Sequence, residues 1–159
     1  MKKTVNTFKL IVFIFLLFAI ACNTGSFYSK TLDMEGTWKR SDTVVFCVNI
    51  PDAGHHFNFY IDIRNNTDYR YSNLYVFLHS EFPNGNITHD TLEFILAKKD
   101  GEWIGKGMGN VKENNILIRP NLIFPDTGTY CFTLEQAMRV EELQGIEDIG
   151  IRIEKAEQK

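Results

Sequence analysis

The chain has 159 residues, of which 44% are hydrophobic and 23% charged, with 17 basic against 20 acidic side chains. This length suits one domain with a sizeable core. The acidic balance, a net charge of −3, argues against nucleic acid or an anionic lipid surface as the partner.

The N-terminus has the organisation of an export signal. Lys2, Lys3 and Lys9 form a basic region without acids, and the unbroken apolar run 10–21 follows. A helix needs about 20 apolar residues to cross a bilayer, so this run is too short for a permanent membrane span. We predict that residues 1–21 are a signal peptide that is removed.

The cysteine after the run indicates which kind of signal this is. Small residues precede it in Ala19-Ile20-Ala21-Cys22, as in a lipobox, although Leu is usual where Ala19 stands. We predict that lipoprotein signal peptidase cleaves before Cys22 and that Cys22 carries acyl chains such as palmitate. An ordinary cleavage site beside an incidental cysteine is the alternative. Without the three signal lysines, 14 basic residues oppose 20 acidic ones.

Two further cysteines, Cys47 and Cys131, form an even pair in a chain that matures in an oxidising compartment. A disulfide across this separation would stabilise the fold by roughly 4 to 5 kcal/mol in the chain-entropy model, and measured gains are often smaller. Two unpaired cysteines packed as small hydrophobic side chains are the alternative.

The segment 22–35 is short, polar and without periodicity, so we expect a lipidated, poorly ordered tether. The remaining residues, 36–159, are predicted to form a single domain. Within it, short runs of β-branched and aromatic residues alternate with turn sequences, which indicates strands. The predicted strands lie at 44–50, 57–63, 69–79, 92–96, 103–109, 116–124, 130–138 and 149–153.

Details of these runs suggest how the strands are arranged. The turn at 51–54 should join the first two as an antiparallel pair, and the strand at 69–79, apolar on both faces, should be central. Alternate glycines at 105, 107 and 109 suggest a bulged strand or a close backbone approach. A capping-box pattern at 133–136 could instead open a helix ending before Gly145. We favour strand to about Met138, followed by a short helical turn.

About eight strands and at most one short helix predict an all-β fold, an antiparallel β-sandwich of immunoglobulin-like or jelly-roll-like type. The sequence Asp126-Thr127-Gly128-Thr129-Tyr130 resembles the turn before the tyrosine corner of immunoglobulin-like domains. The cysteine of those domains would fall at Phe132. Cys131 is one position away and should point to the opposite face, so an immunoglobulin-type inter-sheet disulfide is not expected.

The residue patterns of known catalytic and metal sites are missing from the sequence. His55, His56, His79 and His89 show no metal-ligand spacing, no serine lies in a Gly-x-Ser-x-Gly elbow, and scattered acids alone do not define a glycosidase. We therefore predict no enzyme activity, no cofactor and no metal. Asp42-Thr43-Val44 and Asp90-Thr91-Leu92 resemble a periplasmic O-glycosylation acceptor, a short pattern in which Thr43 or Thr91 would be modified.

The stretch 64–75 has the most distinctive composition in the chain, because Tyr, Arg and Asn are concentrated there. These residue types are typical of recognition surfaces. The alternative is a cluster of tyrosines packed over the sandwich rim with wet hydroxyls. The candidate binding residues are Arg64, Tyr69, Arg70, Tyr71 and Asn73.

Several separated segments, in the same order, resemble the GldH family of gliding-motility lipoproteins. The match extends from about Trp38 to Lys155. Its main segments are Ile63-Arg64-Asn65, Tyr69-x-Tyr71-Ser72-Asn73-Leu74, Asp90-Thr91-Leu92-Glu93, Trp103-x-Gly105-x-Gly107, Gln136-Ala137-Met138-Arg139 and Gly145-Ile146-x-Asp148-Ile149-Gly150-Ile151-Arg152-Ile153-Glu154-Lys155.

This resemblance implies an envelope lipoprotein required for surface motility and associated with the machinery that moves and secretes adhesins. It implies no catalytic residues, and only Cys22 carries over as a functional position. We expect an outer-membrane rather than an inner-membrane anchor. The partners would be the membrane, through the lipid, and envelope proteins of that machinery, without nucleic acid. A lipid-anchored glycan-binding domain is the alternative, since β-sandwiches with exposed tyrosines often bind sugars.

Overall fold

Alternation of buried and more exposed side chains marks several of the long strands of the domain. In β3 (Val44–Ile50) every second residue, beginning with Val44, is buried, and the residues between them face solvent. The face that these apolar side chains share must pack against a second layer, because successive side chains of a strand point to opposite sides. The sequence therefore requires a second sheet opposite β3.

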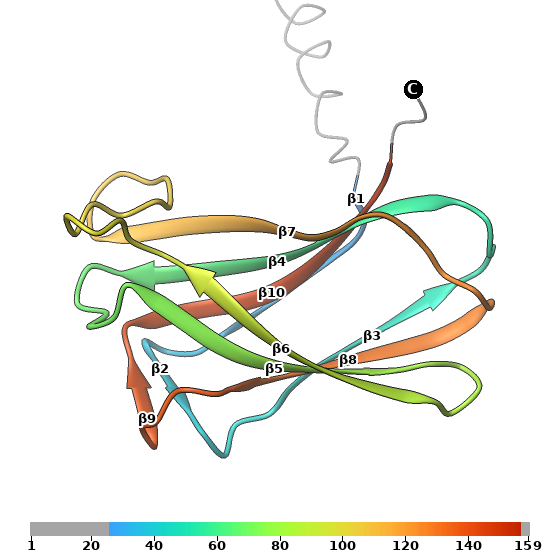
Figure 1. Cartoon of the computed structure of the whole chain (residues 1–159), viewed down its shortest axis with the longest axis horizontal. Helices are drawn as coiled ribbons and strands as arrows, with labels where there is room; N and C mark the ends of the chain where they lie inside the picture. The colour runs from blue at the N-terminus through green and yellow to red at the C-terminus, as the bar shows by residue number, and fades with distance from the viewer. Residues whose placement is uncertain (1–25, 157–159) are drawn as a thin grey trace, which may run out of the picture.

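The computed structural model describes residues 26–156, and in this range it contains eight strands of seven residues or more and two of three residues (Figure 1). The strands are β1 (Ser26–Asp33), β2 (Thr37–Lys39), β3 (Val44–Ile50), β4 (His56–Asn66), β5 (Asn73–Glu81), β6 (Ile87–Ile95), β7 (Val111–Ile123), β8 (Gly128–Gln136), β9 (Glu142–Gln144) and β10 (Ile146–Lys155). The all-β prediction is confirmed. The predicted signal peptide and Cys22 lie outside the described residues.

Two four-stranded antiparallel sheets face each other, with strand orders β1-β10-β4-β7 and β3-β8-β5-β6, and the short strands β2 and β9 pair separately. Among the described long strands, only β5 and β6 follow one another as a hairpin within a sheet. The other connections pass from one sheet to the other. This topology is of the jelly-roll type, one of the two types of sandwich that were predicted. Between the sheets lies a continuous apolar core that includes Trp38, Phe59 and Ile151.

The expected pairing of 44–50 with 57–63 is wrong. β3 pairs with β8, whereas β4 lies in the opposite sheet between β10 and β7. The turn sequence at 51–54 was read correctly as a break. A turn pattern does not distinguish a hairpin from a connection that crosses between two sheets, because both leave the same alternation on either side.

Three other local predictions also differ from the structure. The strand predicted at 103–109 is absent, because only the isolated bridges Ala97–Trp103 and Lys106–Glu113 form there. The segment 137–141 bends without forming a helical turn. The strand predicted from residue 69 begins at Asn73.

The poorly ordered tether predicted at 22–35 is corrected from Ser26 onward. Residues 26–33 form β1, which pairs with β10 from Ser26 opposite Glu154 to Asp33 opposite Asp148. Most side chains of β1 are exposed, so the sequence carries no apolar period. Backbone hydrogen bonds to β10 order this edge strand.

The loops gather at the two ends of the sandwich. We call the end where β1 begins the near end, and the opposite end the far end. The near end also holds the loops 51–55, 82–86 and 124–127. The far end holds the β2–β9 ribbon and the connections 67–72, 96–110 and 137–141 (Figure 1). None of the residues 26–156 belongs to a helix that could span a bilayer.

Candidate functional site

The predicted binding residues all lie at the far end, but they do not form one surface. Arg64 projects from the outer face of β4, where its Nε donates to Asp148 Oδ2 at 2.7 Å. The Asp148 carboxylate raises the pKa of Arg64. Arg70 and Tyr71 lie in the β4–β5 connection, and Asn73 begins β5.

Tyr69 is a packing residue, and its inclusion in a binding surface is wrong. Only 3% of it is exposed. Its hydroxyl donates to the Asn73 carbonyl at 2.8 Å, and burial raises the pKa of Tyr69 well above its usual value. A side chain enclosed in this way cannot contact a ligand unless the far end rearranges. Tyr69 therefore packs inside the domain, and its hydroxyl is enclosed, unlike the wet hydroxyls of the packing alternative.

Tyr71 borders a depression that the sequence did not reveal. This far-end depression has a volume of about 490 Å³ and is lined by Tyr71, Tyr75 and the segment 137–140. Tyr71 and Tyr75 are 37% and 36% exposed, and Arg139 is exposed beside them. It therefore combines two half-exposed aromatic rings with one guanidinium group.

Buried and partly buried polar contacts hold the walls of the far-end depression in place. The Gln136 side chain receives a hydrogen bond from the Met138 backbone N–H and donates one to the Val140 carbonyl, each at 2.9 Å. Arg40 Nη2 donates to the Met138 carbonyl at 2.6 Å. On the opposite wall, the Tyr71 ring meets the buried Tyr69 ring edge-on at 5.7 Å. The depression is thus largely formed before any partner arrives.

One carboxylate ties two residues of this region together. Glu93 on β6 accepts a hydrogen bond from Asn73 Nδ2 at 2.7 Å. The same carboxylate raises the pKa of Tyr75, because it bonds to the protonated hydroxyl. Asn73 therefore acts within the protein, as a fixed neighbour of the depression.

The far-end depression is lined by residue types that are common on recognition surfaces. Tyr and Arg supply much contact area with few flexible bonds, and they are enriched where partners bind tightly. Tyr75 lies within the stretch 64–75 but was not among the candidate residues, and Arg139 was missed because it lies more than 60 residues further along the chain. The segment Gln136–Arg139 was part of the family resemblance, and that was the available signal.

The outer face of the β1-β10-β4-β7 sheet carries ion pairs. Arg152 donates to both carboxylate oxygens of Asp62, at 2.9 and 3.1 Å, and also pairs with Glu154. Its guanidinium lies 4.2 Å from the centre of the Tyr60 ring. These groups satisfy one another, so we assign them a structural role.

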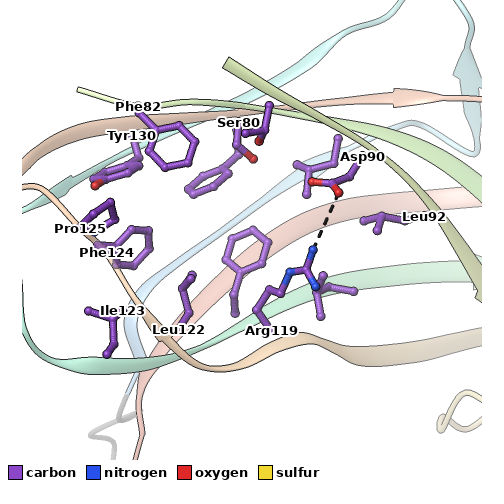
Figure 2. Close-up of a pocket in the computed structure, with 15 residues that line it drawn as sticks. Ser80, Phe82, Asp90, Leu92, Arg119, Leu122, Ile123, Phe124, Pro125 and Tyr130 are labelled. Carbon is purple, nitrogen blue, oxygen red and sulfur yellow. Dashed lines mark ion pairs between the residues drawn. The ribbon is translucent and has the colours of Figure 1, made fainter. Parts of the chain in front are cut away.

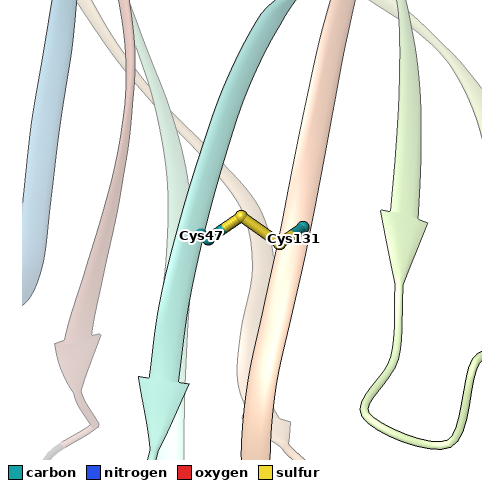
Figure 3. The surroundings of a disulfide bond; sticks show 2 residues. All are labelled: Cys47 and Cys131. Atoms are coloured by element: carbon teal, nitrogen blue, oxygen red, sulfur yellow. A yellow bond between two sulfur atoms is a disulfide. The ribbon is translucent and has the colours of Figure 1, made fainter.

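Cys47 and Cys131 lie directly opposite each other on the neighbouring strands β3 and β8, and the structure joins their sulfur atoms at 2.05 Å (Figure 3). The bond lies on the outer face of one sheet, while Phe132 points into the core. The disulfide is therefore not an inter-sheet bridge of immunoglobulin type.

We expect alkylation without prior reduction to leave both Cys47 and Cys131 unlabelled, which mass spectrometry can measure. The double variant Cys47→Ala with Cys131→Ala should lose about 2–4 kcal/mol of unfolding free energy in urea titration, because the unfolded chain is no longer cross-linked. Two labelled cysteines in the folded protein would contradict the bridge.

The four histidines lie apart from the far-end depression. His79 and His89 face each other across β5 and β6 with ring centres 4.6 Å apart, and His55 lies 3.1 Å from Asp52 at the near end. Within residues 26–156, His, Cys, Asp and Glu form no group of three that could hold a metal ion. Thr43 and Thr91, the candidate O-glycosylation positions, are both exposed.

These features define a small β-sandwich with a disulfide on one outer face and a depression lined by tyrosines and an arginine at one end. The sequence profile of the GldH lipoprotein family matches residues 26–153. The chain belongs to this family, which confirms the resemblance. It is therefore a lipoprotein of the cell envelope whose family is linked to gliding motility.

Two relatives match over nearly their whole length. The gliding motility lipoprotein GldH homolog of Christiangramia forsetii is 36% identical over 96% of this chain and 98% of its own. The gliding motility lipoprotein GldH of Flavobacterium johnsoniae is 30% identical over 94% and 96%. Among solved structures, Xyl-CBM35 in complex with a glucuronic acid-containing disaccharide has a TM-score of 0.42 at 15% identity, covering 87% of this chain and 86% of its own. A likeness at this level does not bear on function.

Proposed function

We propose that the protein is a non-catalytic interaction module, anchored by lipid on Cys22, that supports gliding motility by binding an envelope protein at the far-end depression. The main support is family membership over almost the entire domain, because the relatives are named for gliding motility. The placement of the depression adds to this. It lies opposite the end where β1 begins, so an anchor attached just before β1 leaves it accessible.

The reach of the anchor can be estimated from the sequence. Three residues, 23–25, separate Cys22 from Ser26, and the four Cα-to-Cα steps between them can span at most about 14 Å. The near end would therefore stay close to the membrane, and the far end would point away from it. We also propose that the lipid inserts into the outer membrane. The protein would act there within the machinery that moves and secretes adhesins.

The test replaces single side chains with a photo-crosslinking phenylalanine derivative in intact cells. We expect the derivative at Tyr71 to link the protein to one discrete envelope protein. At Phe77, which is similarly exposed on the outer face of β5, it should give no link to that protein. Equal crosslinking at both positions would contradict a specific partner surface.

Loss-of-function variants extend the test to motility in a gliding host. Tyr71→Ala combined with Arg139→Glu should abolish spreading, while the protein stays folded and membrane-bound. The matched pair Phe77→Ala with Lys30→Glu should spread normally. The glycan-binding alternative makes a different prediction, namely retention on a polysaccharide column that is lost in Tyr71→Ala.

A further inference from the structure

The open side of the sandwich between β6 and β7 contains a cleft that the far-end function does not use. Its volume is about 370 Å³, and it lies between the two sheets in the half nearest the start of β1 (Figure 2). The floor is apolar and includes Phe59, Leu78 and Phe132, which also belong to the core. The cleft is thus a part of the inter-sheet core that the chain leaves unfilled.

The two sheets separate progressively from the end of β6 towards its start. Its inward residues change from exposed Thr88 through half-buried Asp90 and Leu92 to buried Phe94. On the other side, the pairing of β7 with β4 is irregular near Arg119, and Asn121 has a positive φ of 52°. The opening is therefore a consequence of how these two edge strands run.

The mouth of the cleft carries one weak ion pair. Arg119 Nη2 lies 3.8 Å from Asp90 Oδ1, beyond hydrogen-bond distance, and the two side chains are 62% and 42% exposed (Figure 2). Exposed pairs of this kind contribute little stability. Of the lining residues, Arg119 is the only cation. A carboxylate at the mouth could accept two hydrogen bonds from its guanidinium group, a stronger arrangement.

We propose that this cleft binds a single long-chain fatty acid, with the acyl chain between the sheets and the carboxylate on Arg119. The apolar floor suits the chain, and the volume lies near the lower end of the range typical of small-ligand pockets. Arg119 offers the complementary charge. A polar sugar would find few hydrogen-bonding groups below the mouth.

The position of the cleft supplies a source for such a ligand. The Phe27 ring at the start of β1 packs 5.2 Å from Phe57, which lies 5.5 Å from Phe124 in the cleft wall. If Cys22 is anchored as proposed above, the opening therefore lies close to the membrane. This step rests on the proposed anchor, whereas binding in the cleft does not.

Binding can be measured on the mature chain from residue 22 with Cys22→Ala, which carries no lipid. Within residues 26–156, the buried residues of the core cluster lie between Met34 and Ile153, so we expect this variant to fold without the acyl group. We expect cis-parinaric acid, which fluoresces in apolar surroundings, to bind saturably with one molecule per chain. Palmitate should displace it at least ten times more effectively than hexadecanol, which lacks the charge.

Three variants locate the binding site. Arg119→Gln should weaken binding about tenfold or more, Asp90→Asn should tighten it by freeing the guanidinium, and Leu92→Trp should block the cleft. Arg139→Gln at the far end is the matched control and should bind normally. Absence of saturable binding, equal displacement by acid and alcohol, or unchanged binding in Arg119→Gln would overturn the proposal. Loss of motility in the Tyr71 and Arg139 variant, with fatty acid binding intact, would separate the two functions.

Discussion

Replacing Cys22 with Ala is expected to release a folded domain from the membrane and to abolish motility, in a gliding host, as completely as deletion does. A single acyl chain of about 14 carbons gives only marginal membrane binding, and the two or three chains of a mature lipoprotein are needed for stable anchoring. Fractionation, thermal melting and mass spectrometry of the N-terminus measure anchoring, folding and acylation separately.

The histidines provide the control for this experiment. Replacing any one of His55, His56, His79 or His89 with Ala should leave motility unchanged, because a binding module has no single catalytic atom. An unmodified N-terminus would rule out the anchor. A single histidine or carboxylate whose loss abolished function in a folded, membrane-bound protein would favour an enzyme.

Gly145→Ala is expected to be among the most destabilising small substitutions in the domain. Gly145 lies between β9 and β10 with φ of +91°, and a Cβ there would approach the backbone N and Cα of Tyr69 to 2.7 Å. The left-handed conformation costs about 1–2 kcal/mol for a residue with a side chain, and the clash adds about 1–3 kcal/mol. Total stabilities are only about 5–15 kcal/mol, so unfolding in urea should shift markedly.

Gly85→Ala is the matched control for this effect. Gly85 has a similar φ of +82°, but a Cβ there would meet no atom within 4 Å. It should therefore lose only the conformational contribution. Equal losses in the two variants would show that the contact with Tyr69 is unimportant.

The parts of the fold that could be predicted are the strands in which apolar and polar residues alternate along the sequence. Residues 44–50 read as a strand because the pleat repeats every two residues, whatever the strand pairs with. β1 was missed because its partner β10 lies more than a hundred residues away and orders it through backbone atoms. The cross-sheet path from β3 to β4 was missed because loop sequence does not encode which sheet comes next.

The candidate site was predictable only in part. The composition of 64–75 pointed to the end of the molecule that holds the depression and to Tyr71, yet it could not show that Tyr69 turns inward. Met138 and Arg139 lie more than 60 residues further along the chain, and only the folded sandwich brings them to Tyr71. The cleft at Arg119 also depends on the separation of two strands, which no local pattern reports.

The pairing of β1 along β10 also determines how the domain bears mechanical load. β1 begins at the near end, a few residues after the proposed anchor, and its hydrogen bonds to β10 lie across the long direction of the strands. A pull between the membrane and the far end therefore acts parallel to the strands. Such a pull loads these bonds together in shear, whereas peeling would break them one after another, so the attachment can transmit tension while the sandwich stays intact.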